Sequence, residues 1–215
     1  MKKTFFALCT ALTLGACGSN SSPALIGQQL SRALARPPSV DLRTTLTPEF
    51  LAQVGQPVLF VELPQRRAQA GTLLSQQDGT RQIWTSLDGI AVTLQSGILT
   101  ETRGLGGDLM TTDLGNVTAA MRGETDSAVR IHRYLNGEDG IDALAFVCTY
   151  SRQNDVAVAT LAGNFRTLRL TENCTGPTIT FENHYWLGRS GLPIKSVQWV
   201  GPNVGYAEIE QTTAQ

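Results

Sequence analysis

This 215-residue sequence lacks an excess of positive charge and long hydrophobic runs, and it contains few cysteines. Lys and Arg total 17 against 18 Asp and Glu, so the chain lacks the basic face that a nucleic-acid binder needs. The apolar run over residues 5–14 is about half the ~20 residues that cross a bilayer as a helix, which excludes a transmembrane helix there. Charged residues make up only 16% and hydrophobic residues 41%, a profile that favours an exported β protein with an adequate core.

The N-terminus has the pattern of an export signal for lipid attachment. Lys2 and Lys3 precede the apolar run, and Leu-Gly-Ala-Cys at residues 14–17 matches a lipoprotein box without departure. We therefore predict a signal peptide over 1–16, a lipidated tether over 17–23 and a single β domain over 24–215, with Cys17 acylated. Two or three acyl chains anchor a protein firmly, whereas one chain does so only marginally. The alternative is an ordinary signal peptide with a chance cysteine.

The residue after the predicted lipid anchor indicates a destination. Gly18 stands where enterobacterial lipoproteins retained in the inner membrane have Asp. Its identity predicts an outer-membrane protein that faces the periplasm. The mature chain would carry 15 Lys and Arg against 18 Asp and Glu, so no nucleic-acid partner is expected.

Two cysteines remain once Cys9 leaves with the signal and Cys17 carries lipid. Cys148 and Cys174 are an even pair in an oxidising compartment, which predicts a disulfide. Closing that loop would stabilise the fold by about 3–4 kcal/mol if unstrained. Two buried thiols are the alternative, and neither cysteine has a second Cys or His at the spacing of a zinc site, so no metal is expected.

Apolar periodicity predicts an all-β fold after a short N-terminal helix. Ser22 and Pro23 begin that helix, residues 47–51 offer a second, and residues 117–121 form a helical turn. From residue 57 onward the period is two, and Asp88-Gly89 is a hairpin turn signal. About a dozen strands make a large antiparallel meander, curled into a half-barrel or a sandwich. The predicted strands are 58–61, 71–75, 81–86, 90–94, 98–103, 129–132, 144–150, 156–161, 165–171, 178–187, 192–200 and 204–211.

Few residues are arranged for catalysis. Gly104 to Gly107 lacks the glycine spacing of a dinucleotide loop and the Lys of a P-loop, so these glycines suit backbone turns. The turn at residues 188–191 lacks the last glycine of a nucleophile elbow, and no carboxylate motif adjoins His132 or His184. Residues 136–142 lack the spacing of a calcium loop. We predict no catalytic residues.

Four residues are candidates for a binding surface. Arg103 and Asp108 flank the glycine-rich loop, which would meet a sugar or a partner if exposed. Trp84 and Trp186 could stack on sugar rings, and core packing is the alternative for both, since large aromatic side chains dominate β cores.

Several stretches resemble one known family. They are Trp84-Thr-Ser-Leu-Asp-Gly89, Gly97-Ile-Leu-Thr-Glu-Thr-Arg-Gly-Leu-Gly-Gly-Asp-Leu109, His184-Tyr-Trp186 and Ser196-Val-Gln-Trp-Val-Gly-Pro202. Together with the lipoprotein box they resemble the YjbF/GfcB family of group 4 capsule polysaccharide lipoproteins. The resemblance implies an outer-membrane lipoprotein encoded among exopolysaccharide or capsule secretion functions, with an antiparallel β fold. It implies neither catalytic residues nor a cofactor.

Three functional hypotheses follow. The first is a non-enzymatic lipoprotein, attached to the membrane through Cys17, that assists polysaccharide secretion by binding polymer or an outer-membrane secretion protein. The second is a carrier or chaperone for a lipid-type ligand, which needs an apolar cavity of roughly 300 Å³ or more. The third is a polysaccharide hydrolase, which needs two carboxylates about 5–10 Å apart in a cleft.

Overall fold

The structure, a computed structural model, describes residues 41–138 and 140–212. The predicted signal peptide, the tether, Cys17 and the helix that begins at Ser22 lie outside the described residues. The helices are α2 (Leu42–Thr45), α3 (Pro48–Val54), the 3-10 helix η1 (Pro64–Arg66) and α4 (Val117–Arg122). The strands are β1 (Val58–Leu63), β2 (Ala68–Asp78), β3 (Arg81–Thr85), β4 (Ala91–Gln95), β5 (Ile98–Arg103), β6 (Leu109–Asp113), β7 (Ser127–Leu135), β8 (Ile141–Thr160), β9 (Gly163–Thr175), β10 (Thr180–Leu187), β11 (Pro193–Gly201) and β12 (Gly205–Gln211).

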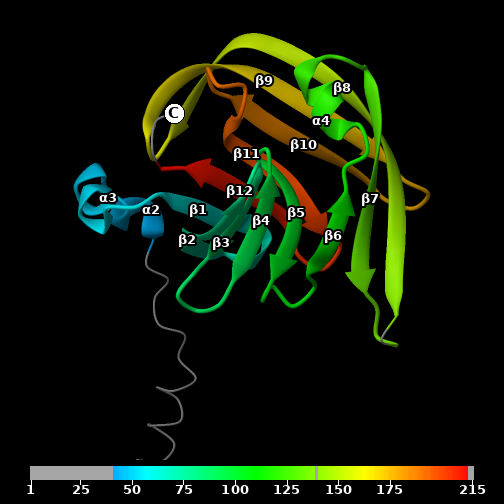
Figure 1. Cartoon of the computed structure of the whole chain (residues 1–215), viewed down its shortest axis with the longest axis horizontal. Coiled ribbons are helices and arrows are strands. Elements are labelled where there is room, and N and C mark those ends of the chain that lie inside the picture. Colours follow the sequence, from blue (N-terminus) through cyan, green and yellow to red (C-terminus); the bar gives the residue numbers. More distant parts are fainter. Residues whose placement is uncertain (1–40, 139, 213–215) are drawn as a thin grey trace, which may run out of the picture. The chain divides into compact units, whose positions relative to one another are not determined.

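The strands form one antiparallel sheet in the order β5-β4-β3-β2-β1-β12-β11-β10-β9-β8-β7-β6. Neighbours in the chain are neighbours in the sheet, except that β5 and β6 are the two edges and β1 pairs with β12. Figure 1 shows the sheet curling round on itself, so that it forms a nearly closed barrel. The predicted all-β antiparallel meander is confirmed, and a single curled sheet replaces the sandwich alternative.

Local sequence explains the short helix α3. The hydroxyl of Thr47 accepts a hydrogen bond from the backbone N–H of Phe50 at 3.2 Å, and Pro48 occupies the first turn. Gly55 ends the helix in the left-handed region with φ of 67°. A Ser, Thr or Asp cap, an early proline and a final glycine together define a helix of this length. The helix predicted near residues 47–51 is therefore confirmed.

The two edge strands are joined by side chains in place of a backbone ladder. The backbone N–H of Leu109 on β6 donates to Thr102 Oγ1 on β5 at 2.9 Å. From β11, Gln198 accepts from the N–H of Leu99 at 2.8 Å and donates to the carbonyl of Gly97 at 3.0 Å. The side-chain amide of Gln198 thus takes the place of a peptide group of a neighbouring strand. It satisfies backbone hydrogen-bonding groups of β5 at the edge of the sheet.

The inward face of the sheet is filled by side chains. The largest fully buried ones on this face include Trp84, Tyr185, Phe146 and Arg130, whereas Phe60 is buried on the other face of β1, beneath α2 and α3. One apolar cluster joins β1, β3, β4, β6 and β12, and a second joins α4 to β5, β9 and β10 through Val117, Ala120 and Met121. Helix α4 therefore contributes its apolar side to the core beside β7.

Strands β8 and β9 extend well beyond their neighbours, as their long arch in Figure 1 shows. Their pairing is interrupted by a bulge between Gln153 and Val156, where Asp155 has φ of 58°. We call residues 153–167 the β8–β9 arm. Its tip is attached to β12, because the N–H of Leu161 donates to Glu210 Oε2 at 3.1 Å. The remainder of the arm is largely exposed.

An ion-pair cluster holds α2 against the sheet. Arg43 bonds Glu62 at 3.0 Å and Glu210 at 2.8 Å, and its guanidinium lies 4.5 Å from the ring centroid of Phe60. Lys195 adds bonds to Glu208 at 2.7 Å and to Glu210 at 2.9 Å. Burial would raise the pKa of Glu210, but Lys195 and Arg43 outweigh it and the net shift is downward. No helix within 41–138 and 140–212 is long and apolar enough to span a bilayer.

Candidate functional site

An aromatic and cationic group lies on the outward face of β9 and β10. Trp186 stands directly between Arg169 of β9 and Lys195 of β11 in the register of the sheet. The guanidinium of Arg169 lies 5.9 Å from the Trp186 ring centroid, and the His184 ring lies 6.0 Å from it. We call Arg169, His184 and Trp186 the Trp186 platform. All three side chains are half-buried, so each presents part of its surface to solvent.

Hydrogen bonds orient the histidine of this platform. His184 Nε2 lies 2.9 Å from Glu182 Oε1, and Nδ1 lies 3.2 Å from the hydroxyl of Thr171. Burial lowers the pKa of His184; Glu182 opposes that shift and Arg169 adds to it. The imidazole is therefore neutral at pH 7, donating through Nε2 and accepting through Nδ1. The platform thus offers an aromatic face, a fixed cation and neutral hydrogen-bonding groups.

The two candidate tryptophans lie in different environments. Trp84 on β3 is only 2% exposed and packs in the cluster formed with β1, β4 and β12. Its indole Nε1 is buried without a hydrogen-bond partner among the described residues. Trp84 is therefore a core residue, as the core-packing alternative predicted, whereas Trp186 is partly accessible on the outward face.

Asp108 organises the loop between β5 and β6. Its Oδ1 accepts from Thr102 Oγ1 and from the N–H of Leu105, each at 3.0 Å, and its Oδ2 accepts from the N–H of Gly104 at 3.1 Å. Three donors on one carboxylate fix the glycine-rich loop against the edge of the sheet. Arg103 is exposed beside it and donates to the carbonyl of Thr102 at 3.3 Å. Asp108 is thus a loop-building residue, and Arg103 is the exposed one.

The same loop contacts the turn between β11 and β12. A Cβ on Gly107, which has φ of 152°, would lie 2.7 Å from Asn203 Cβ, so this approach requires glycine. Arg66 of η1 joins the two segments by donating to the carbonyls of Leu105 and, at 2.7 Å, of Asn203. Asn203 directly follows the stretch Ser196–Pro202, and Gln198 within that stretch bonds Gly97 and Leu99, so two of the stretches that carry the family resemblance meet in space. Sequence reasoning missed Arg66, because no local pattern links it to partners 39 and 137 residues away.

A buried polar network, which no sequence pattern indicated, lies on the inward face. Glu172 Oε2 accepts from Arg130 Nη1 at 2.8 Å, Asn183 Nδ2 at 2.7 Å and Tyr185 at 2.9 Å. Its Oε1 accepts from Tyr150 at 2.7 Å. Burial acts to lower the pKa of Arg130, but Glu172 outweighs it and the net shift is upward, so Arg130 stays charged. Glu172 is 0% exposed and its carboxylate is held by four donors inside the sheet, so it does not face a substrate.

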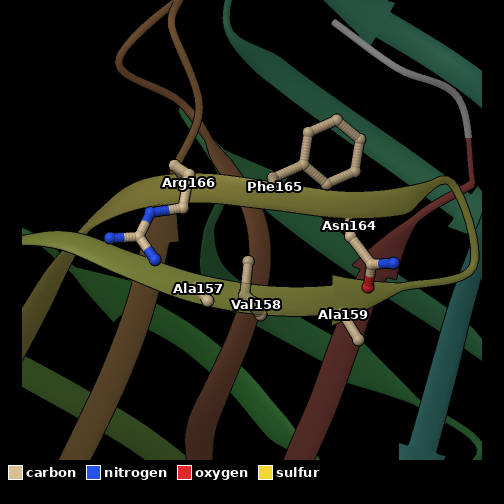
Figure 2. A pocket seen from close by; sticks show the side chains of 6 residues that line it. All are labelled: Ala157, Val158, Ala159, Asn164, Phe165 and Arg166. Atoms are coloured by element: carbon tan, nitrogen blue, oxygen red, sulfur yellow. The ribbon is translucent and has the colours of Figure 1, made fainter.

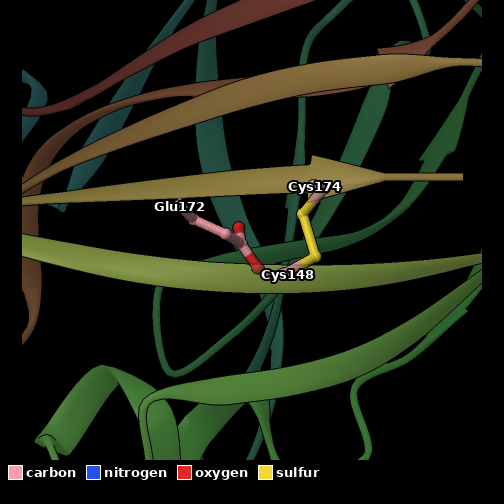
Figure 3. A group of neighbouring side chains, drawn as sticks. All are labelled: Cys148, Glu172 and Cys174. Atoms are coloured by element: carbon pink, nitrogen blue, oxygen red, sulfur yellow. A yellow bond between two sulfur atoms is a disulfide. The ribbon is translucent and has the colours of Figure 1, made fainter.

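The predicted disulfide is present beside this network. Cys148 and Cys174 are directly opposed on β8 and β9 and are bonded to each other (Figure 3). Ligand atoms of both cysteines and Glu172 lie within 4.8 Å of one another. This set does not fit a metal ion, because the sulfurs are oxidised and Arg130 already neutralises the carboxylate.

The two histidines do not share a site. His132 faces inward, where Phe146 and Phe181 contact its ring at centroid distances of 5.2 and 5.6 Å. Burial and the charge of Arg130 hold the pKa of His132 well below its usual value. His184 faces outward on β10, so the sheet itself separates the two rings. Asn136 accepts from the N–H groups of Glu138 and Gly140, which makes the 136–142 segment a hydrogen-bonded turn.

Two surface hollows accompany the β8–β9 region. The larger, of about 380 Å³, is formed by the arm itself, as Figure 2 shows. It is lined by Ala157, Val158, Ala159, Asn164, Phe165 and Arg166. The second, of about 310 Å³, is lined by Asn173, Cys174, Thr175, Thr180, Phe181 and Glu182. Both are open hollows on the β8–β10 strands, whereas the carrier hypothesis requires an apolar cavity inside the sheet.

Fold and site together define an antiparallel β-sheet protein with a packed interior and a polar, aromatic outward face on β9 and β10. Residues 27–212 match the family described as "Group 4 capsule polysaccharide lipoprotein gfcB, YjbF". The chain belongs to this family of capsule polysaccharide lipoproteins. The resemblance seen in the sequence is thereby confirmed.

A solved structure supports the fold independently. The crystal structure of the hypothetical lipoprotein YmcC from Escherichia coli (K12) is similar, with a TM-score of 0.66 and 14% sequence identity. The similarity covers 92% of this chain and 99% of YmcC. At this identity the likeness concerns the fold alone. No curated protein matches the chain.

Proposed function

We propose that this protein is an outer-membrane lipoprotein, anchored through acylated Cys17 and facing the periplasm, that assists secretion of a capsule or exopolysaccharide. It does so without a catalytic step, by binding the polymer on the outward face of β9 and β10. Family membership supports the link to capsule polysaccharide. The lipoprotein box supports the anchor.

The observation that carries this proposal is the Trp186 platform. Sugar rings have apolar C–H faces and polar hydroxyl edges, so an indole face beside hydrogen-bonding groups is suited to them. Arg169, held at 5.9 Å from the indole ring, adds a cation that favours polymers bearing carboxylate or phosphate groups. Trp186, His184 and Arg169 lie on adjacent antiparallel strands, which keeps their spacing fixed.

The packed interior argues against the lipid-carrier alternative. Trp84, Tyr185 and Phe146 each expose 2% or less of their surface, and they fill the inward face of the sheet. A carrier would have to displace these side chains, at a cost of several kcal/mol of packing. The hydrolase alternative lacks support as well, since the inward carboxylate of Glu172 is 0% exposed and is held by four donors inside the sheet.

A second mode, binding of a secretion partner, is favoured by the loop at residues 103–108. Arg103 is exposed, Leu87 in the neighbouring β3–β4 turn is 100% exposed, and the glycine positions keep both segments closely packed. A fixed, exposed loop with an apolar and a cationic side chain suits a protein interface. This mode is compatible with polymer binding, because it uses a different surface.

The test is polysaccharide binding by Trp186→Ala. We expect affinity for polymer purified from the producing strain to fall about 2- to 10-fold, the loss of one aromatic contact worth roughly 0.5–1.5 kcal/mol. Isothermal titration calorimetry measures this directly. The matched control is Trp84→Phe, which alters a buried tryptophan and should lower stability while leaving affinity unchanged. Equal affinity in Trp186→Ala and the unsubstituted chain would refute polymer binding at this face.

A further inference from the structure

The outward face of β7 and β8 is apolar where the outward face of an antiparallel sheet is ordinarily polar. Val129, Leu135, Ile141 and Val147 expose 48, 64, 58 and 57% of their surface. Alternation along both strands puts them on the face opposite to the buried Arg130, His132, Phe146 and Cys148. With Ile131, Ala143 and Ala145 they form what we call the β7–β8 strip.

Register arranges the strip in four consecutive rows. The directly opposed pairs are Val129–Val147, Ile131–Ala145, Arg133–Ala143 and Leu135–Ile141. From the first row to the last is six residues, or about 20 Å of strand. Contiguous exposed apolar surface on a folded domain, with polar residues around it, marks a contact with another molecule. The flanking positions on β9, Asn173 and Thr175, are polar and uncharged.

One positive and one negative charge accompany the strip. Arg133 lies in the third row, and Asp113 of β6 lies beside Ile131 in the second row, on the same outward face. Arg133 is half-buried yet has neither an ion pair nor a hydrogen bond to any residue within 41–138 and 140–212. Asp113 is exposed and uses Oδ1 to accept from the N–H of Gly115 at 3.0 Å. An arginine without a partner amid aliphatic side chains calls for a carboxylate from another chain.

This pattern is complementary to itself. A two-fold axis in the plane of the strip, perpendicular to the strands and midway between the second and third rows, exchanges the first row with the fourth. Val129 then faces Leu135 of the second copy, and Val147 faces Ile141 of the second copy. The same axis places Arg133 of each copy in the row of Asp113 of the other copy, so the contact contains two such charge pairs. Two sheets packed face to face in this way are nearly aligned, as in β-sandwiches.

We propose that the β7–β8 strip binds the same strip of a second copy of this chain, giving a two-fold symmetric dimer. A closed, isologous contact of this kind is the commonest form of homo-oligomer. Because a strip of seven small aliphatic side chains is below the standard ~800 Å² per partner, the dimer is reversible. The Trp186 platform lies on β9 and β10, outside the strip, and stays accessible in both copies.

Cysteine cross-linking tests the geometry. In the double variant Val129→Cys/Leu135→Cys the two introduced thiols of one chain are about 20 Å apart, so they cannot bond to each other. Mild oxidation of membranes from cells producing the full chain should give a covalent product of twice its mass. The control, Val129→Cys alone, should give none, because the two introduced thiols then lie at opposite ends of the contact. No dimer from the double variant, or equal dimer from both, would overturn the proposal.

A second measurement uses charge. Arg133→Asp should lower the dimer fraction of the purified full chain at least tenfold in sedimentation equilibrium, with detergent density-matched. Asp113→Arg combined with Arg133→Asp should restore it, since the opposite charges meet again. Circular dichroism verifies that each variant is folded. A single-chain mass for the unsubstituted protein, or a cross-linked product that contains a different protein, would contradict a contact between two copies.

Discussion

At the scale of single residues, the buried ion pair between Arg130 and Glu172 shapes the interior. Their side chains are 1% and 0% exposed, so each charge depends on the other for its solvation. Such a pair adds little net stability, but removing one member leaves a charge buried without compensation. The donors from Tyr150, Asn183 and Tyr185 are all arranged around this one carboxylate.

We therefore predict that Glu172→Gln destabilises the protein by about 3–5 kcal/mol, because the charge of Arg130 stays buried and unpaired. Urea unfolding followed by circular dichroism measures the change. The combined variant Arg130→Met/Glu172→Leu should recover much of the loss, since both charges are then gone. A combined variant as unstable as the sum of the two single ones would contradict this account.

The roles of some residues could be predicted from the sequence and those of others could not, for physical reasons. The disulfide was predictable, because only Cys148 and Cys174 remain as a pair once the N-terminal cysteines are assigned. The contrast between Trp84 and Trp186 was not, because each tryptophan adjoins another large apolar residue, Ile83 or Tyr185. The alternation of each strand is therefore compatible with the tryptophan on either the inward or the outward face. Glu172 was overlooked because a carboxylate in a polar segment is normally solvated.

At the scale of elements, Asp108 connects the loop between β5 and β6 to the seam of the sheet. It holds the N–H groups of Gly104 and Leu105 and the hydroxyl of Thr102. Thr102 in turn accepts from Leu109 across the two edge strands. The loop and the seam therefore depend on one carboxylate.

We expect Asp108→Ala to open this seam. Loss of charge-assisted hydrogen bonds should cost about 1–3 kcal/mol and raise hydrogen exchange in peptides covering residues 98–113. Asp78→Ala, at an exposed position ending β2, is the matched control and should leave exchange there unchanged. Polysaccharide affinity should also stay constant, because the Trp186 platform lies on other strands. Unaltered exchange in Asp108→Ala would show that Asp108 does not hold the seam.

Most strands were predictable from the period of two, and the exceptions have identifiable causes. β6 (Leu109–Asp113) was missed because it follows a glycine-rich loop and shows only one apolar alternation. β8 was predicted as two strands, since residues 151–155 are polar and a bulge interrupts its pairing with β9. The strand predicted over 71–75 is shorter than β2, which runs from Ala68 to Asp78. In each case pairing with neighbours extended a strand that its own sequence marks weakly.

At the scale of the whole molecule, three titratable groups make stability depend on pH in the same direction. The pKa values of His132 and His184 are lowered, chiefly by burial, and that of Glu210 is lowered because Lys195 and Arg43 outweigh its burial. A lowered folded-state pKa means that the unfolded chain binds the proton more readily. Stability is therefore full above the unfolded-state pKa and declines as pH falls.

We predict that the free energy of unfolding declines from about pH 6.5 downward, by up to roughly 1.4 kcal/mol per pH unit for each histidine that resists protonation. A further decline below about pH 4.5 would come from Glu210. Urea unfolding between pH 8 and pH 5 measures the first window. His132→Phe should flatten it, since the ring between Phe146 and Phe181 no longer titrates. A slope identical to that of the unsubstituted chain would exclude His132 as the titrating group.

At the same scale, the proposed lipid anchor is separable from folding. Cys17 stands 24 positions before Asp41, the first described residue, so Cys17→Ser should leave the sheet, its disulfide and its polysaccharide affinity intact. It should nevertheless release the protein from the membrane fraction, because acyl chains contribute about 0.8 kcal/mol per buried methylene and a serine carries none. Fractionation with immunoblotting measures release, and polymer in the culture medium measures secretion. We expect secretion to fall although binding persists, since a platform that diffuses freely no longer concentrates polymer at the membrane. Persistent membrane fractionation of Cys17→Ser would contradict lipid anchoring, whereas undiminished secretion by the released protein would contradict a need for the anchor.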